Sequence, residues 1–309
     1  MKVSIIILNW NRKEDTLSCM KSLKESRIKD FELEIIVVDN GSTDGSQQTV
    51  ARYIKEAKKV GNRRWKLIEL EENTGFVKGN NVGIKYALDA GADYIILLNN
   101  DTIVEQDCIS NLVGYANKHK DIGLISPKIY FAKGFEFHKA RYKDKDLGKV
   151  FWYAGGDIDW NNVYGSNHGV DEVDEGQYDK TKETDFATGC CILIRREVLD
   201  KIGLLDKRYF AYYEDSDLSQ RARKAGWKVV YYPFAHLWHK VAQSSGIGSG
   251  LNDYFTTRNR LLFGIRYVSL RTKFALIRES LKHLLIGRKW QKIGARDFYL
   301  GRFGKGSWK

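Results

Sequence analysis

Two short clusters of carboxylate and amide side chains are the parts of this sequence best suited to chemistry. The first is Asn99, Asn100 and Asp101, which directly follows the apolar run at 94–98. An aspartate with neighbouring oxygen ligands at a strand end suits a hard divalent cation, and such a cation suits a diphosphate. The alternative is a turn in which these side chains bond to their own backbone.

The second cluster is Glu214 and Asp215, which stand between the aromatic pair Tyr212 and Tyr213 and an expected helix. Because a helix N-terminus stabilises a carboxylate, Asp215 is expected to stay ionised and able to accept a proton from a hydroxyl group. The alternative is an ordinary helix cap, a role that the next two residues would also fill.

Two further side chains extend these clusters. Asp39 follows the apolar run at 35–38, and a carboxylate there suits the ring N–H of uracil or thymine, or a ribose hydroxyl. The alternative is a helix cap within the loop at 41–44. His239 is a candidate second metal ligand, because a neutral imidazole coordinates divalent metals. A structural histidine is the alternative at that position.

The elements that would position these groups alternate between strands and helices in residues 1–101. Apolar runs at 3–8, 33–38, 65–70 and 94–98 predict strands, with helices between them. This alternation is typical of a parallel sheet with crossover helices. Ligands of open α/β sheets gather beyond the carboxyl ends of the strands, so the loops there are expected to border one crevice.

The middle of the chain is less regular. A helix is expected at 104–118, and an irregular insertion or pair of hairpins at 131–184. Helical spacing returns at 218–225, and a strand is expected at 227–232, ending at Pro233.

Composition limits the class of protein. The chain has 309 residues, of which 43% are hydrophobic, and a formal net charge of +12, which favours anionic partners. It has no apolar stretch long enough to span a membrane, and its first apolar run is too short for a signal peptide. The four cysteines form no Cys-x-x-Cys pair, and we expect buried or free thiols in a reducing compartment. A cytoplasmic location follows.

Five motifs occur in a fixed order along the chain, at 3–11, at 38–44, at 73–76 with 80–83, at 98–101, and at Glu214-Asp215 with His239. Together they resemble the motifs of family 2 glycosyltransferases, and most closely the rhamnosyltransferase-type branch used in bacterial polysaccharide synthesis. The resemblance covers roughly residues 1–262, and its specificity comes from the ordered set, because any one motif alone is weak.

The resemblance implies a GT-A fold, in which a Rossmann-like nucleotide-binding half (1–101) and an acceptor-binding half (102–262) share one mixed, mostly parallel sheet. It implies a metal-dependent, inverting hexosyltransferase that moves a sugar from a dTDP- or UDP-linked donor to a saccharide or lipid-linked acceptor. Mg²⁺ or Mn²⁺ is the implied cofactor. Rhamnose is favoured only by the resemblance, and uracil and thymine offer Asp39 the same ring N–H.

The resemblance also implies roles for single residues. Asp215 falls on the catalytic base, and Glu214 falls on a contact to the acceptor hydroxyl. Asp101 falls on the Asp-x-Asp metal motif, whose first aspartate is replaced here by asparagine, and His239 falls on a further metal or diphosphate contact. The positions that fall on nucleotide or donor contacts are Asn9, Asn11, Asp39, Asn73, Gly75, Asn80, Asn99, Asn100 and Arg258.

Residues 263–309 are expected to form a basic, amphipathic helical extension. Its apolar seam consists of Phe263, Tyr267, Leu270, Phe274, Ile277, Leu281 and Leu284. The basic residues around it are Arg266, Arg271, Lys273, Arg278, Lys282, Arg288, Lys289 and Lys292. The seam would pack on the catalytic domain or on a second subunit in a homodimer, or would lie on anionic lipid at the inner face of the cell membrane. Residues 301–309 are expected to be a loose tail.

Three other classes of protein compete with this interpretation. A nucleic-acid-binding protein should gather basic and aromatic residues in a recognisable module, and the sequence contains none. A catalytically silent nucleotide-sugar-binding protein would not need Glu214 and Asp215. A nucleotidyltransferase would carry a Gly-rich, basic phosphate loop, which the segment at 9–12 is not.

Overall fold

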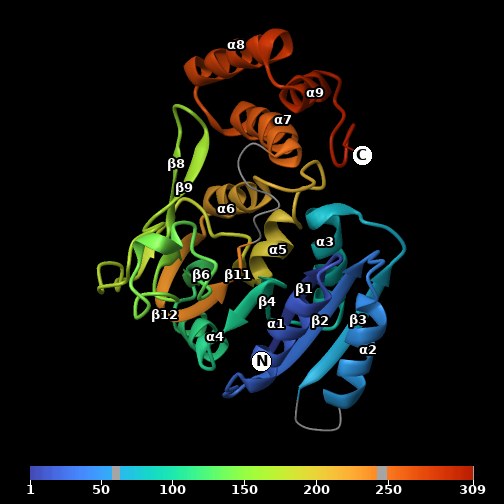
Figure 1. Ribbon diagram of the computed structural model, residues 1–309, viewed down its shortest axis with the longest axis vertical. Helices are drawn as coiled ribbons and strands as arrows, with labels where there is room; N and C mark the ends of the chain where they lie inside the picture. Colours follow the sequence, from blue (N-terminus) through green and yellow to red (C-terminus); the bar gives the residue numbers. More distant parts are fainter. Residues whose placement is uncertain (58–62, 242–248, 309) are drawn as a thin grey trace.

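The computed structural model describes residues 1–57, 63–241 and 249–308, and has the expected α/β architecture (Figure 1). Four parallel strands form one half of the central sheet, in the order β4-β1-β2-β3. Their bounds are β1 (Lys2–Asn9), β2 (Glu32–Asn40), β3 (Arg64–Leu70) and β4 (Tyr94–Asn99).

The other half of the sheet is mixed. Strand β11 runs antiparallel between β4 and β6, and β12 lies parallel to β6 on its other side. Short strands β5, β7 and β10 pair antiparallel with β12, β6 and β12, while β8 and β9 form a separate hairpin. The bounds are β5 (Thr102–Val104), β6 (Ile122–Phe131), β7 (Phe151–Tyr153), β8 (Gly156–Asp159), β9 (Tyr164–Asn167), β10 (Lys182–Glu183), β11 (Cys191–Arg195) and β12 (Lys228–His239).

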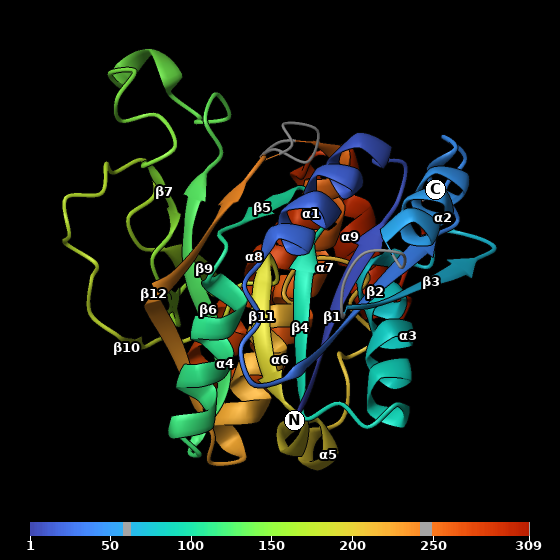
Figure 2. The ribbon, with the colours of Figure 1, turned by 90° about the horizontal axis from the view of Figure 1, so that it is seen from below.

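Helices cover both faces of the sheet, whose strands lie side by side across Figure 2. Successive strand residues point to opposite faces, so Ile5 and Ile7 pack with the helices α1, α2 and α4, while Ile6 packs with α3, α5 and α6. This two-sided burial explains the unbroken apolar runs of the sequence. The bounds are α1 (Lys13–Glu25), α2 (Ser46–Ala57), α3 (Gly75–Asp89), α4 (Cys108–Lys118), α5 (Arg196–Ile202) and α6 (Glu214–Lys224).

Strand β12 does not end at Pro233, and the prediction of an end there was wrong. The register of β12 against β6 shifts between Tyr232 and His236. Pro233 lies in this local irregularity of the pairing, and the strand continues beyond it. Its last residue, His239, pairs with Thr102 of β5. The continuation therefore carries His239 to the carboxyl end of β4.

Two helix starts also differ from the sequence-based expectation. Residues 102–104 form β5, so α4 begins at Cys108 rather than at 104. Helix α6 begins at Glu214, so Glu214 and Asp215 lie in its first turn instead of preceding a helix at 218–225.

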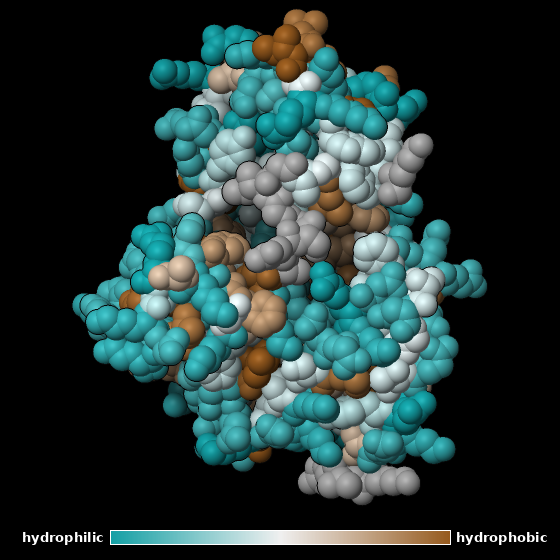
Figure 3. Space-filling model, viewed as in Figure 1, coloured by the Kyte–Doolittle hydropathy of each residue, from teal (hydrophilic) through white to brown (hydrophobic). Residues whose placement is uncertain are grey.

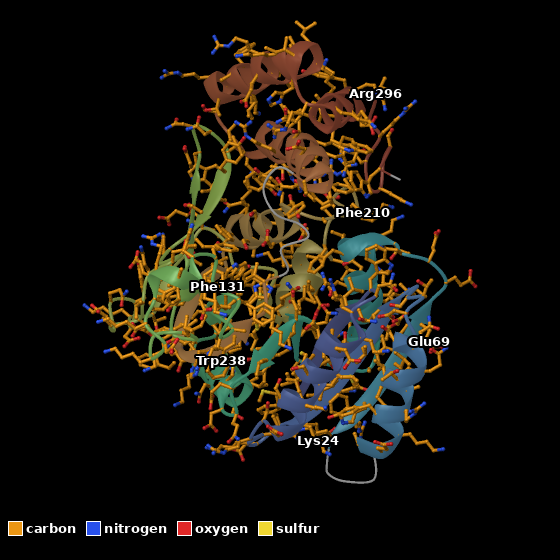
Figure 4. All side chains as sticks on the ribbon, in the orientation of Figure 1. Lys24, Glu69, Phe131, Phe210, Trp238 and Arg296 are labelled. Carbon is orange, nitrogen blue, oxygen red and sulfur yellow. The ribbon has the colours of Figure 1, made fainter. Side chains whose placement is uncertain are left out.

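Three C-terminal helices, α7 (Gly250–Tyr267), α8 (Leu270–Ile286) and α9 (Lys289–Tyr299), lie together at the top of Figure 1. The division expected after residue 262 falls inside α7. Phe255 of α7 stacks on Phe210 with ring centroids 5.0 Å apart, and Figure 4 labels Phe210 between α3 and the C-terminal helices. The C-terminal helices are therefore packed on the part of the chain that precedes them.

The C-terminal segment from 301 to 308 is not a loose tail, contrary to expectation; Lys309 lies outside the described residues. The backbone N–H of Ser307 donates to Asp297 Oδ2 at 2.9 Å, and Trp308 contacts the rings of Tyr254 and Trp290. All four cysteines are buried free thiols, as expected. Within the described part of the chain, no helix is long and apolar enough to cross a membrane.

Candidate active site

The carboxyl ends of β1 and β2 carry a buried amide and carboxylate cluster. Asn9 Nδ2 donates to Asp39 Oδ2 at 2.7 Å, and Asp39 Oδ1 accepts from Ser42 N at 2.9 Å and Gln47 Nε2 at 3.0 Å. Both Asn9 and Asp39 are fully buried. Asn100 Nδ2 reaches Asn9 Oδ1 at 3.3 Å, which joins this cluster to the end of β4. The parallel strands thus bring together residues that are far apart in sequence.

The loops that follow β1, β2 and β3 are fixed by asparagine side chains. Asn11 has φ 52° and accepts a bond from Thr43 N at 2.7 Å. Asn73 Oδ1 accepts from Asn40 Nδ2 at 3.0 Å and from Gly75 N at 2.9 Å. Gly75 has φ +86°, and a Cβ there would meet the Phe210 ring at 2.3 Å, so only glycine fits.

Two predicted donor-binding residues have other contacts in the structure. Asn80 is buried and donates to the carbonyl oxygen of Phe76 one turn earlier in α3. Arg258 is completely buried, and its guanidinium donates to Asn259 Oδ1 and to the carbonyl oxygens of Arg208 and Arg302. In this conformation the Arg258 guanidinium bonds to protein groups and holds α7 in place, so its expected contact with the donor stays a prediction.

Asp101 and His239 form the part of the site that would suit a cation. His239 Nε2 lies 3.1 Å from Asp101 Oδ1, and both side chains are largely buried. Asp101 Oδ1 nevertheless accepts no hydrogen bond. In an octahedral Mg²⁺ or Mn²⁺ site with ligands at about 2.1 Å, neighbouring ligand atoms lie about 3.0 Å apart. The spacing and the unused oxygen therefore fit two adjacent ligands of one metal ion.

Few side chains could act as further ligands to a cation at this pair. Among residues 1–57, 63–241 and 249–308, no group of three or more His, Cys, Asp and Glu side chains could hold a metal ion. The Asn99 N–H is committed to the Cys190 carbonyl at 2.9 Å, and its own carbonyl accepts from Thr102 Oγ1 at 2.7 Å. A metal here would keep most of its coordination for substrate oxygens and water, as Mg²⁺ commonly does.

An unusual backbone turn directly precedes Glu214 and Asp215. Tyr212 and Tyr213 both have positive φ, at 69° and 71°, a conformation that is costly for residues with large side chains. Asn259 Nδ2 on α7 donates to the carbonyl oxygen of Tyr212 at 2.9 Å and to that of Ala211 at 2.8 Å. The left-handed turn is therefore held by the C-terminal helices and starts α6 abruptly.

Asp215 is held by backbone donors. Its Oδ2 accepts from Gly189 N at 2.9 Å and its Oδ1 accepts from Ser216 N at 2.7 Å. Burial raises the pKa of Asp215, while these hydrogen bonds act in the opposite direction. The residue after Gly189, Cys190, accepts the Asn99 N–H, so a short chain of contacts connects Asp215 to the end of β4.

Glu214 differs from its neighbour in its hydrogen bonding. Its side chain is buried, and Glu214 Oε2 has no hydrogen-bond partner. Burial, reinforced by the adjacent charge of Asp215, raises the pKa of Glu214 from 4.5 to about 8. The raised pKa favours the protonated form of Glu214 at pH 7, and no local sequence pattern indicates this.

A cavity of about 580 Å³ opens beside Asp215, between the catalytic part and the C-terminal helices. Asp39, Asp101 and Glu214 are not among its lining residues. Its wall combines aromatic rings with neutral and charged polar groups, including Trp152, Tyr164, Tyr212, Tyr213, Asn252, Thr256, Arg260, Glu279, His283 and Arg288. Sequence reasoning missed this lining, although the aromatic residues of the irregular 131–184 segment were a signal.

Ion pairs shape the side of this cavity formed by the C-terminal helices. Arg260 of α7 makes a two-pronged pair with Glu279 of α8, at 2.8 and 3.0 Å, and its guanidinium lies 4.2 Å from the centre of the Tyr164 ring. Arg288 pairs with Asp253 through its Nε at 2.7 Å. Trp152, on another wall, packs against His239 in a T-shaped arrangement, with the ring centroids 4.6 Å apart. Trp152 thus connects the cavity wall to His239 of the candidate metal pair.

Comparisons with known proteins agree with this arrangement. The family model described as "Glycosyl transferase family 2" matches residues 4–203. An N-acetylglucosaminyl-diphospho-decaprenol L-rhamnosyltransferase of Mycobacterium tuberculosis is 27% identical over 222 residues, covering 69% of this chain and 68% of the relative. The dTDP-rhamnosyl transferase RfbF of Shigella flexneri is 24% identical over 281 residues, covering 91% and 81% of the two chains.

A solved structure shows the same fold. The structure of GalNAc-T7 with UDP, GalNAc and Mn²⁺ superposes with a TM-score of 0.62 at 17% identity, covering 97% of this chain and 57% of that one. The fold is that of the GT-A glycosyltransferases. The chain belongs to glycosyl transferase family 2 and is similar to its rhamnosyltransferases. This membership confirms the predicted activity in cell-surface polysaccharide synthesis and disfavours a catalytically silent binding protein.

Proposed function

We propose that this chain is a metal-dependent, inverting transferase that moves a sugar from a dTDP- or UDP-linked donor, with dTDP-rhamnose favoured, to a saccharide or lipid-linked acceptor. One observation carries the proposal. The carboxylate of Asp215, whose pKa burial raises, lines a cavity of about 580 Å³ and is linked through Gly189 and Cys190 to the strand end that bears Asp101. Such an acid stands between space for an acceptor and the candidate diphosphate site.

The nucleotide would bind at the carboxyl ends of β1 and β2. Asn11, Asn73 and Gly75 shape the loops there, and Asp39 remains the proposed partner of the base. The carboxylate is buried and Gln47 Nε2 occupies its Oδ1 at 3.0 Å. A uracil or thymine ring N–H would therefore take the place of the Gln47 donor. Uracil and thymine would replace the Gln47 donor in the same way.

Asp101 and His239 would hold the divalent cation, with Asn99 and Asn100 beside them. When bound, Mg²⁺ or Mn²⁺ would offset the negative charge of the departing diphosphate. The support from this chain is the 3.1 Å spacing of the two ligand atoms and the Asp101 oxygen that accepts no hydrogen bond.

Asp215 would accept the proton of the acceptor hydroxyl as that oxygen attacks the anomeric carbon. Its raised pKa makes it a stronger base than an exposed aspartate, and its backbone donors keep it oriented. The other carboxylates that line the cavity, Asp253 and Glu279, are each paired with an arginine, so a single displacement with inversion is favoured over attack by a second acid. Glu214, neutral at pH 7, would donate a hydrogen bond rather than accept one.

The acceptor would occupy the cavity beside Asp215. Aromatic rings such as Trp152 and Tyr164 offer faces to a sugar ring, and Asn252 and Thr256 offer neutral hydrogen-bonding groups. A lipid-linked acceptor is proposed by similarity to the mycobacterial relative, whose name specifies a diphospho-decaprenol substrate.

A thermal-shift and turnover screen tests this function. The protein is mixed with UDP- and dTDP-sugars, with and without Mn²⁺, and both unfolding temperature and release of nucleoside diphosphate are followed. A rise in unfolding temperature that needs both the nucleotide-sugar and Mn²⁺, with turnover for the same donor, supports the proposal. No stabilisation and no turnover with any donor would refute it.

A further inference from the structure

The outer face of α8 carries an exposed apolar ridge. Leu270, Phe274, Leu281 and Leu285, spaced by four, seven and four residues, are 72%, 72%, 49% and 76% exposed. This spacing places the four side chains along one side of the helix. Figure 3 shows hydrophobic side chains gathered at the top of the molecule, where Figure 1 draws α8. Side chains this large and exposed along one helix face indicate an interaction surface.

The ridge is not the whole seam suggested by the sequence. Phe263 is fully buried and stacks with Trp160, and the Tyr267 hydroxyl donates to Asp217 Oδ1 at 2.7 Å, so the first part of the seam packs on the catalytic domain. Leu270 and Phe274 turn outward after α7 ends. The packing alternative for the seam therefore accounts for its first residues and leaves the ridge without a partner inside the described chain.

Basic side chains flank the ridge. Within α8 the sequence has four Lys and Arg residues against a single acid, Glu279, and that acid is paired with Arg260. In the part of the chain that the structure describes, no carboxylate lies within ion-pair distance of the basic residues of this flank, which are Arg271, Lys273, Arg278 and Lys282. The flank thus keeps its positive charge available to a partner.

The opposite side of the same helix faces the cavity beside Asp215. Glu279 and His283 line that cavity, while Leu276 and Ser280 are buried against the rest of the protein. One helix therefore has its inner face on the proposed acceptor cavity and its apolar ridge turned away from it.

We propose that this face of α8 docks on an anionic phospholipid bilayer. The apolar ridge would enter the interface, and the basic flank would contact anionic headgroups. Charge favours this occupant over a second copy of the chain, because a symmetric contact along the ridge would bring two unpaired basic flanks together. Docking would hold the cavity next to the membrane, as a lipid-linked acceptor requires.

Vesicle sedimentation without any substrate tests the docking. The full chain is spun with phosphatidylglycerol-containing vesicles and with pure phosphatidylcholine vesicles at low and moderate salt. We expect binding to the anionic vesicles that weakens with salt. Phe274→Ser with Leu285→Ser should lower the partition coefficient by more than about tenfold, and Arg271→Gln with Lys282→Gln by about tenfold or more.

Matched variants control for lost apolar surface and lost charge elsewhere. Phe234→Ser removes another ring that is 59% exposed, and Lys21→Gln with Lys55→Gln removes two exposed charges from α1 and α2. Both controls should bind vesicles as the unmodified chain does. The unfolding temperature of the α8 variants should match that of the unmodified chain, which would show that they are folded.

The docking proposal is overturned if the unmodified chain does not bind anionic vesicles, or if the α8 variants bind as well as the controls. A dimer in light scattering that dissociates in Phe274→Ser with Leu285→Ser, without vesicle binding, would assign the ridge to a second copy instead. The result is independent of the transferase proposal, because vesicle binding is measured without donor or acceptor.

Discussion

The side-chain amide of Asn259 donates a hydrogen bond of 2.9 Å to the carbonyl oxygen of Tyr212, three residues before the proposed base. The same amide donates to the carbonyl oxygen of Ala211 at 2.8 Å. Because Tyr212 and Tyr213 are both in the left-handed region, this contact from α7 stabilises a costly turn. The C-terminal helices thus help to position Asp215 as well as to enclose the cavity.

Asn259→Asp isolates this role. The carboxylate keeps the oxygen that accepts from the Arg258 guanidinium, but it loses both N–H donors and faces two carbonyl oxygens. We expect kcat to fall by on the order of 100-fold, because small displacements of a catalytic group have effects of that size. The donor dissociation constant should change little. Asn161→Asp, in an exposed loop, is the control, and equal kcat values for the two variants would show that the turn needs no support from α7.

Asp215→Asn tests the proton acceptor. The amide preserves size and the contact with Gly189, but it cannot take a proton from the acceptor hydroxyl. We expect turnover to fall by about 100-fold or more, with donor binding nearly intact. Turnover close to that of the unmodified enzyme would remove Asp215 from this role, whereas a loss of donor affinity alone would move it to the donor site.

The sequence predicted the half of the site that depends on strand ends. Unbroken apolar runs identify strands buried on both faces, and parallel pairing then forces Asn9, Asp39 and Asp101 to one edge of the sheet. His239 was named from its motif, yet the strand that carries it was expected to stop at Pro233. A local irregularity in β12 depends on tertiary pairing, which no local pattern reports.

The acceptor side was far less predictable. Trp152 and Tyr164 reach the cavity through long-range packing of an irregular segment, and Arg260 does so through its pair with Glu279. Arg258 was equally hard to predict, because a basic residue that was expected to contact the donor is completely buried here. The aromatic residue four positions earlier, Tyr254, whose ring lies 5.2 Å from the guanidinium, was the available sign of such packing.

Asp101→Ala tests the metal pair. Removing the carboxylate leaves His239 as the sole partner from this pair, so Mn²⁺ should no longer strengthen donor binding. In calorimetric titrations with Mn²⁺ present, we expect the donor dissociation constant to rise by at least about tenfold. The control is Asp121→Ala, which removes an exposed carboxylate paired with Lys228. If donor affinity in Asp101→Ala still increases on adding Mn²⁺, the cation binds elsewhere.

Glu214→Gln tests the neutral acid through the pH dependence of stability. The pKa of Glu214 is raised from 4.5 to about 8 in the folded chain, so between these pH values the folded state holds a proton that the unfolded state has released. The free energy of unfolding should therefore fall as pH rises through this window, with a slope of at most about 1.4 kcal/mol per pH unit. Glutamine cannot ionise, so the variant should gain stability relative to the unmodified chain as pH rises.

Denaturant unfolding at pH 5 and pH 8.5 measures this difference, with Glu56→Gln on the exposed face of α2 as the control. The free energy of unfolding of Glu214→Gln minus that of the unmodified chain should increase from pH 5 to pH 8.5. Only the unmodified chain has an acid here that must stay protonated or be buried with its charge. The same difference for Glu56→Gln should not change with pH. Parallel pH profiles for Glu214→Gln and the unmodified chain would mean that Glu214 is ionised in the folded state, and its proposed role as a hydrogen-bond donor would fail with that result.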